Sequence, residues 1–372
     1  MKSEKISTFL QERIEAKDFP SAVYLVAEKG EIAFQDSLGF AVVEPEKIEA
    51  RTNTIYDLAS LTKPLITGLL CAKLIEKGKL KLEDKVFRYF ILFNREQKSE
   101  ITVRDLLAHT SGFAAWKPFY LITDTRLRSV NLAYIADEPL ENESHTRVAY
   151  SDLNFILLSY LLEDLYGGRR FNEIAEREIF EPLSLQNTFF NPPKELQKQI
   201  AANEKGNEYE KLMCVNLGCN ISEYDWRDYQ IWGEVHDGNC YFMDGVSGHA
   251  GLFSNVHDTF RIAQQFIANQ TKLLKPKTCD LFRTNFTPNL NEARSIAFQL
   301  AETKNSTASL ALSKDSFGHL GFTGTSLWID PSTERIFILL TNRTHARRLP
   351  FANINSVRQK FHEIAAKLID ER

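Results

Sequence analysis

The chain has 372 residues, a formal net charge of -4 and 43% apolar residues, which is the composition of a globular protein. Its length suggests two or three domain-sized units. The mild acidic excess argues against a nucleic-acid partner, because proteins that bind nucleic acid carry a basic surplus. No apolar run reaches the ~18 residues that a membrane span needs.

The cysteines and the first residues bear on the cellular compartment. Five cysteines are an odd number, and none has CxxC spacing, so neither a disulfide framework nor a zinc ribbon is expected. Residues 1–13 predict an amphipathic helix that lacks the apolar centre of a secretion signal. We therefore expect a cytoplasmic protein, or a periplasmic one if a leader has been removed.

Predicted strands lie near both ends of the chain, and predicted helices lie between them. The strands are expected at Ala22–Ala27, Glu31–Ser37, Thr325–Ile329 and Arg335–Thr341. Helical periodicity is found at Val103–Ala108, Leu153–Tyr166, Phe171–Phe180, Val256–Ala268 and about Asn353–Ile369. This order predicts an α+β protein in which both chain ends build one antiparallel sheet flanked by helices.

The same order predicts two domains. Residues 1–80 and 290–372 would form the sheet domain, and residues 81–289 a mainly helical insertion. The active site is expected in the cleft between them, where pockets commonly form.

One segment places a serine and a lysine on the same helix face. Ser60 and Lys63 are three residues apart, so the amine can lie against the hydroxyl, which needs a base to become a nucleophile. Pro64 predicts a helix start at about Ser60, and Gly78 predicts the helix end. Ser-x-x-Lys is the nucleophile signature of penicillin-recognising enzymes, although an N-cap serine with a surface lysine has the same pattern.

Two more segments carry polar side chains at the edges of predicted elements. Tyr150-Ser-Asp152 opens an apolar helical run and by itself indicates a helix cap. His319-Leu-Gly321 precedes a strand, where glycine lets another group approach the backbone closely. Taken singly, these residues indicate structure rather than catalysis.

Together, the three segments resemble the serine β-lactamase-like superfamily, and within it class C β-lactamases, D-alanyl-D-alanine carboxypeptidases and family VIII esterases. The stretches 57–64, 101–112, 245–254 and 326–331 also resemble that family. The resemblance covers the chain from about Ser21 to Ile369. It implies a β-lactamase/transpeptidase-like fold and no cofactor.

The resemblance also implies roles for single residues. Ser60 would attack a carbonyl, and Lys63 with Tyr150 would hold and move its proton. Which of the two is the base stays open, because a lysine that stays charged can instead stabilise a tyrosinate. The backbone N–H groups of Ser60 and Phe322 would hold the oxyanion.

Two departures from the family pattern bear on the substrate. Asp152 stands where the family usually has Asn, and His319-Leu320-Gly321 stands where it usually has Lys-Thr-Gly. An ionised Asp152 accepts a hydrogen bond from Lys63 but cannot donate one to a substrate amide, and His319 is only partly charged near neutrality. Both changes weaken recognition of a β-lactam and favour esterase or peptidase-like work.

The remaining candidates are weaker. His249 is expected to shape a loop at the cleft edge, and Arg347 is a candidate for a substrate carboxylate. No HExxH sequence or tight ligand pair occurs, so no metal is expected. Without Gly-x-Ser-x-Gly, an α/β-hydrolase is not expected either.

We therefore expect a cofactor-free serine hydrolase that forms an acyl-enzyme with a small ester or a D-alanyl-type amide. One alternative is a non-catalytic, penicillin-binding-like protein that binds a peptide or a cell-wall fragment. A metal-dependent hydrolase is the other. The oligomeric state is left open.

Overall fold

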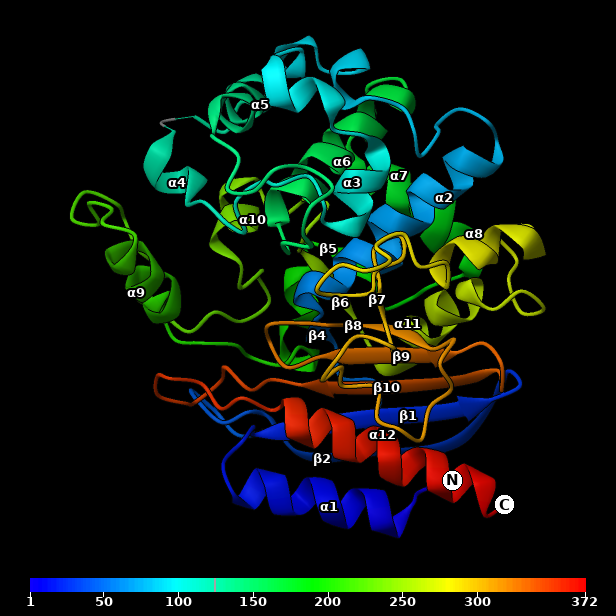
Figure 1. Cartoon of the computed structure of the whole chain (residues 1–372). Helices are drawn as coiled ribbons and strands as arrows, with labels where there is room; N and C mark the ends of the chain where they lie inside the picture. The colour runs from blue at the N-terminus through cyan, green and yellow to red at the C-terminus, as the bar shows by residue number, and fades with distance from the viewer. Residues whose placement is uncertain (124) are drawn as a thin grey trace.

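A seven-stranded antiparallel sheet crosses the computed structural model, which describes residues 1–123 and 125–372 (Figure 1). Its strand order is β3-β2-β1-β10-β9-β8-β7, so strands from both chain ends meet at its centre. The bounds are β1 Ser21–Glu28, β2 Glu31–Val42, β3 Ile48–Glu49, β7 Gln299–Leu300, β8 Phe317–Leu320, β9 Ser326–Asp330 and β10 Arg335–Thr341. The pairing of β1 with β10 confirms the sheet that the sequence predicts.

Helices cover both faces of this sheet. Helices α1 (Glu4–Glu15) and α12 (Asn355–Asp370) contact each other on one face, and α11 (Val256–Ala263) contacts β1 and β10 (Figure 1). Helix α11 belongs to the range expected for the helical insertion, although it packs against the sheet. The domain boundaries given above stay a prediction. Among the described residues, no helix has both the length and the apolar character that a membrane crossing requires.

A mainly helical region lies beside the sheet and includes a second, small sheet. Its helices are α2 Leu69–Glu76, α3 Val103–Ala108, α4 Phe119–Ile122, α5 Arg128–Asp137, α6 Asp152–Leu165, α7 Phe171–Ala175, α8 Glu181–Leu183, α9 Glu208–Asn216 and α10 Gly238–Phe242. The small sheet consists of β4 Tyr56–Asp57, β5 Phe189–Phe190 and β6 Leu252–Ser254, in the order β4-β6-β5. Strand β6 of this small sheet contacts the turn that carries Ser60.

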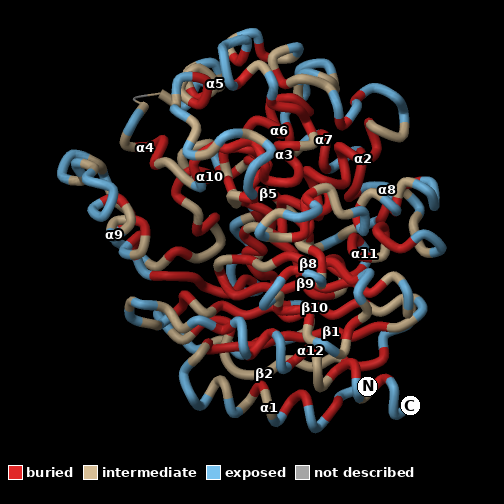
Figure 2. Tube along the Cα trace, viewed as in Figure 1, coloured by how far each residue is buried: buried red, intermediate tan, exposed pale blue. Residues whose placement is uncertain are grey.

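Alternate residues of the central strands enter two separate cores. Val23 and Leu25 of β1 pack in the core that extends into the helical region, whereas Tyr24 and Val26 pack in the core beneath α1 and α12. This follows from the period of two along a strand. Both cores are buried (Figure 2), and each large apolar side chain contributes about 1.5–3 kcal/mol.

Helix α6 fixes the position of the Tyr150–Asp152 segment. All its residues from 153 to 162 are buried, and it contacts both α3 and the segment 63–68. A helix that is apolar on all sides is expected in the interior rather than at the surface. The residues at its N-terminus are therefore held close to Lys63.

The segment after Ser60 is not the uniform α-helix that the sequence predicts. Residues 59–61 form a 3₁₀ turn, residues 63–68 form a wider π-type helical segment, and α2 begins only at Leu69. The predicted end at Gly78 is confirmed, since α2 ends at Glu76 and Gly78 has a φ of 67°. Such π-type turns are frequent at functional sites.

Phe298 provides a test of the core. Its ring is fully buried and packs against the rings of Phe266, Phe282 and Phe317. Phe298→Ala is expected to lower the free energy of unfolding by about 3–5 kcal/mol, because it leaves a cavity. Urea denaturation measures this change. Leu310→Ala, at an exposed side chain, is the control and should change it by less than about 0.5 kcal/mol; equal losses would contradict this description.

Candidate active site

Ser60 lies on a turn that is held in an unusual backbone conformation. The preceding residue, Ala59, has a φ of 48°, a left-handed conformation that costs roughly 1–3 kcal/mol in a non-glycine residue. The Asp57 carboxylate stabilises it by accepting hydrogen bonds from the N–H groups of Ala59 and His236, each at 2.8 Å. The turn presents Ser60 to a cavity of about 540 Å³.

The loop after β8 is tied to the same turn. Thr323 Oγ1 donates to the carbonyl of Asp57 at 2.7 Å, and Thr325 Oγ1 donates to the carbonyl of Leu58 at 3.0 Å. Gly321 is needed here, because a Cβ would lie 2.0 Å from Thr325 Oγ1 and 2.6 Å from the Leu58 carbonyl oxygen. The loop and the turn are therefore held against each other.

This arrangement leaves two backbone donors free at the cavity. Within residues 1–123 and 125–372, the N–H groups of Ser60 and Phe322 donate to no protein group, and both residues line the cavity. A pair of such N–H groups can hold an oxygen on which negative charge develops. These are the two donors that the resemblance implied.

The Lys63 ammonium is fully buried and has three partners. It donates to Ser60 Oγ at 3.0 Å and to the carbonyl of His249 at 3.0 Å, and it forms an ion pair with Asp152 at 2.6 Å. Burial alone would lower the pKa of Lys63, but Asp152 and Tyr150 outweigh burial and raise that pKa. Lys63 is therefore charged in the resting protein.

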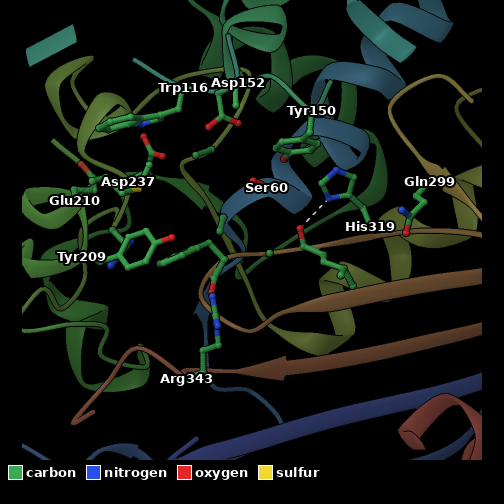
Figure 3. A pocket seen from close by; sticks show the side chains of 18 of the residues that line it. Ser60, Trp116, Tyr150, Asp152, Tyr209, Glu210, Asp237, Gln299, His319 and Arg343 are labelled. Atoms are coloured by element: carbon green, nitrogen blue, oxygen red, sulfur yellow. Dashed lines mark hydrogen bonds between the residues drawn. The ribbon is translucent and has the colours of Figure 1, made fainter. Parts of the chain in front are cut away.

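The ring of Tyr150 packs between two imidazoles. Its centroid lies 4.6 Å from that of His109 and 5.8 Å from that of His319, and Lys63 Nζ lies 4.9 Å from the ring. Burial raises the pKa of the Tyr150 hydroxyl, and the Lys63 charge offsets this only in part. Tyr150 is therefore a neutral phenol beside Ser60 (Figure 3).

Both imidazoles are neutral, because burial holds the pKa of each well below its usual value. His109 Nδ1 accepts a hydrogen bond from the Ser151 N–H at 3.0 Å, which positions the neighbouring Tyr150. His319 Nδ1 donates to the carbonyl of Leu320 at 2.9 Å (Figure 3). Its buried Nε2 has no partner among the described residues. His319 thus offers an acceptor rather than the partial charge expected from the sequence.

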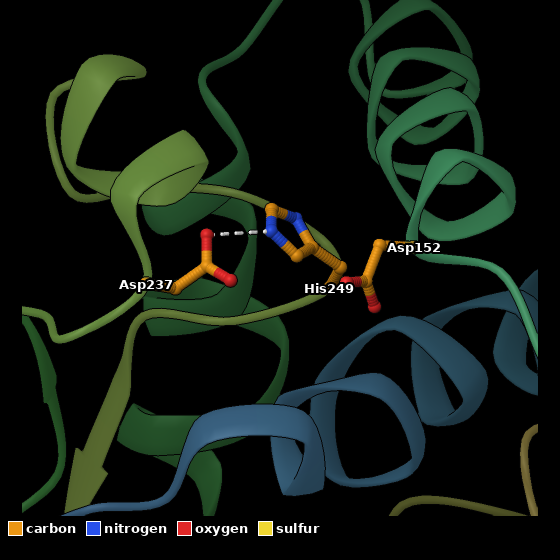
Figure 4. Close-up of side chains that lie close together, drawn as sticks. All are labelled: Asp152, Asp237 and His249. Atoms are coloured by element: carbon orange, nitrogen blue, oxygen red, sulfur yellow. Dashed lines mark hydrogen bonds and ion pairs between the residues drawn. The ribbon is translucent and has the colours of Figure 1, made fainter. Parts of the chain in front are cut away.

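Three side chains with metal-binding chemistry lie close together, although the sequence showed no tight ligand pair. Atoms of Asp152, Asp237 and His249 lie within 4.8 Å of one another (Figure 4). His249 Nε2 contacts Asp237 at 3.0 Å and its Nδ1 contacts Ser247 at 2.8 Å, while Asp152 is paired with Lys63. Because both imidazole nitrogens are engaged and an ammonium adjoins the group, we assign no metal to it.

Arg347 does not line the cavity. Its Nη1 donates to the neighbouring Ala346 carbonyl. Of the basic residues after the last predicted strand (Arg343, His345, Arg347 and Arg348), Arg343 is the one that lines the cavity. Arg294 and Arg358 also line the cavity, and burial lowers the pKa of Arg358 to about 9. The sequence did not mark Arg294 or Arg358, because Arg358 looked like part of an amphipathic helix and Arg294 lies in an irregular segment.

The opposite wall of the cavity is aromatic and acidic. It includes Trp116, Tyr209, Glu210 and Asp237 (Figure 3). Tyr120 donates to Glu210 at 2.7 Å, and burial raises the pKa of Glu210 to about 7. The sequence did not predict this wall, since its residues come from irregular connections and the short helix α9.

Comparisons with known proteins cover almost the whole chain. The chain is 31% identical to the N-acetylmuramyl-L-alanine amidase of Bacillus subtilis (strain 168), covering 92% of this chain and 81% of that protein. It is also 31% identical to a protein of Salmonella enteritidis PT4 that is provisionally named D-alanyl-D-alanine carboxypeptidase, covering 95% of this chain and 84% of that protein.

A solved structure and a family profile agree with these relatives. EstCE1, a hydrolase with promiscuous acyltransferase activity, has a similar fold with a TM-score of 0.74 at 21% identity, covering 96% of this chain and 97% of that chain. The family profile described as Beta-lactamase matches residues 6–358. The chain therefore belongs to the beta-lactamase family of serine hydrolases, and the expected α+β fold and enzyme class are confirmed.

Proposed function

We propose that the protein hydrolyses a small ester or a D-alanyl-type amide through an acyl-enzyme on Ser60. One observation carries this proposal: Lys63 Nζ lies 3.0 Å from Ser60 Oγ at a cavity where two backbone N–H groups are free. The relatives are named as an amidase, a carboxypeptidase and a hydrolase with acyltransferase activity, and all three names describe acyl transfer.

The geometry supports a role for each residue near the nucleophile. Ser60 Oγ attacks the substrate carbonyl, and the N–H groups of Ser60 and Phe322 stabilise the resulting oxyanion. Such donors typically contribute on the order of 10²- to 10³-fold in rate. Lys63 and Tyr150 hold and move the proton that leaves Ser60, because both adjoin its hydroxyl.

The cavity presents few free donors to a substrate carboxylate near Ser60. His319 is neutral and offers an acceptor there. The Arg343 guanidinium donates to the carbonyls of Phe322 and Ala352, and that of Arg358 donates to the carbonyl of Gly321. The Arg294 guanidinium is paired with Glu292. These contacts favour an ester or amide that carries no charge next to its reacting carbonyl.

Covalent labelling tests the nucleophile. A fluorophosphonate is expected to add to Ser60, because Lys63 and the turn activate its hydroxyl, and peptide mass spectrometry locates the adduct. Ser60→Ala should lose both the label and essentially all hydrolysis. An adduct on another serine in an enzyme that turns over an ester would show that the assignment is wrong.

Two substitutions test proton transfer. Lys63→Ala and Tyr150→Phe should each lower kcat by roughly 10²- to 10⁴-fold with a smaller effect on KM, because both groups take part in proton transfer in the transition state. The double variant should lose much less than the product of the two effects, since groups that act as a unit are not additive. Steady-state kinetics on folded variants, checked by circular dichroism, decides this, and full multiplicative losses would refute shared action.

Substrate preference tests the role of His319. Short-chain p-nitrophenyl esters should have a higher kcat/KM than nitrocefin, and His319→Lys with Leu320→Thr should shift the ratio toward nitrocefin by roughly ten- to a hundredfold, the value of one charge-assisted hydrogen bond. Arg347→Ala, which lies outside the cavity, is the control and should leave the ratio unchanged. If the unmodified enzyme prefers nitrocefin to every ester, this account of substrate choice is incorrect.

A further inference from the structure

We propose that Asp152 is the proton store of acylation, taking up through Lys63 the proton that leaves Ser60. The inference rests on the proposed function and adds to it the group on which the proton resides. Two short contacts form the path: a hydrogen bond from Lys63 Nζ to Ser60 Oγ at 3.0 Å, and an ion pair between Lys63 Nζ and Asp152 Oδ1 at 2.6 Å. This buried carboxylate oxygen accepts no other hydrogen bond from the described residues. Lys63 is fully buried, so no solvent interrupts this path.

Neither of the other two candidates can accept the proton in the resting protein. The pKa of Lys63 is raised because Asp152 and Tyr150 outweigh its burial, so its nitrogen has no free electron pair. The pKa of Tyr150 is raised by burial, so its oxygen already carries a proton. A charged lysine can accept a proton from Ser60 only after it has given one of its own away. Its remaining partner, the His249 carbonyl, is not a base, which leaves the Asp152 carboxylate.

The step balances as follows. One ammonium proton first moves from Lys63 Nζ to Asp152 Oδ1. The neutral amine then turns its electron pair toward Ser60, whose O–H bond breaks as its proton passes to Nζ. The electron pair left on Ser60 Oγ bonds to the substrate carbonyl carbon, and the carbonyl π pair becomes the oxyanion. When the oxyanion collapses, the bond to the leaving oxygen or nitrogen breaks. The stored proton returns from Asp152 through Lys63 to the Tyr150 hydroxyl, whose own proton passes to the leaving atom. Lys63 is an ammonium before and after the step.

A carboxylate is essential in this role. An asparagine at position 152 could accept a hydrogen bond from Lys63, but its amide cannot store a proton near neutral pH. Proton uptake and hydrogen bonding by residue 152 can therefore be separated by one isosteric substitution, Asp152→Asn.

Other ionisable groups lie around the Lys63–Asp152 pair and come from different elements of the fold. They are Tyr150 before α6, His109 at the end of α3, Asp237 at the start of α10, His249 before β6, Arg294 before β7 and His319 on β8. Burial keeps both His109 and His319 neutral. Burial opposes ionisation of Asp237, but its contact with His249 outweighs burial and holds the pKa of Asp237 below its usual value. His109, His319 and Asp237 therefore keep one charge state near neutral pH. Glu210 in the cavity wall, whose pKa burial raises to about 7, titrates in the unmodified enzyme and in the Asp152 variants alike.

The pH dependence of kcat/KM for a p-nitrophenyl ester tests the proposal. In the unmodified enzyme, the fall of kcat/KM at low pH (the acid limb of the profile) is expected to follow protonation of the Lys63–Asp152 pair as a unit. In Asp152→Asn the pKa of Lys63 falls, because its carboxylate partner is gone while burial remains, and Lys63 is active only as a free amine. The acid limb should then move to higher pH by more than about one unit, with a loss of roughly 10²- to 10⁴-fold at pH 7.

The conservative variant and the labelling site complete the design. Asp152→Glu retains a carboxylate, so its acid limb should stay in place even though its rate falls. If Asp152→Asn keeps the original limb and loses less than about tenfold, Asp152 only positions Lys63 and the proposal is overturned. Fluorophosphonate labelling of each variant distinguishes a failure of this proposal from a failure of the proposed function. A label on Ser60 with an unmoved limb refutes the proton store alone, whereas a label elsewhere refutes the proposed function.

A measurement on the unmodified enzyme covers the case in which the variants do not fold. Rates in mixtures of H₂O and D₂O should depend on deuterium content in a curved manner, because two proton transfers contribute to acylation. A linear dependence, which indicates one moving proton, would contradict transfer to Asp152.

Discussion

Burying the Lys63 ammonium requires partners from three separate parts of the chain, and these partners set the geometry of the cavity. They are Ser60 on the strained turn, the His249 carbonyl before β6, and Asp152 at the start of α6. An unpaired buried charge costs several kcal/mol, so displacing any one partner is unfavourable. The nucleophile and its neighbours are therefore held in place before any substrate binds.

Asp57 gives a second constraint, which connects the sheet to the helical region. Its carboxylate holds the Ala59 and His236 N–H groups, and its carbonyl accepts a hydrogen bond from Thr323 in the loop after β8. This loop carries Phe322, whereas the turn carries Ser60. The two free N–H groups thus come from different parts of the fold and are brought to one cavity by hydrogen bonds to a single residue.

Much of this could be predicted from the sequence, because period-two strands, apolar helices and the Ser60–Lys63 spacing are local patterns. The predicted strand at Arg335–Thr341 coincides with β10. The π-type segment at 63–68 could not be predicted, because it depends on packing against α6 and other distant elements. Arg343, rather than Arg347, reaches the cavity, since the path of an irregular segment depends on tertiary contacts. The neutral state of His319 likewise follows from burial, which no local pattern shows.

A crystal structure of the enzyme after reaction with a fluorophosphonate tests the central claim most directly, because it shows both the modified residue and the surroundings of the adduct. The account predicts continuous density from Ser60 Oγ to phosphorus, with one phosphonyl oxygen about 2.7–3.1 Å from the N–H groups of Ser60 and Phe322. An adduct on another residue, or a phosphonyl oxygen directed away from both N–H groups, would contradict it.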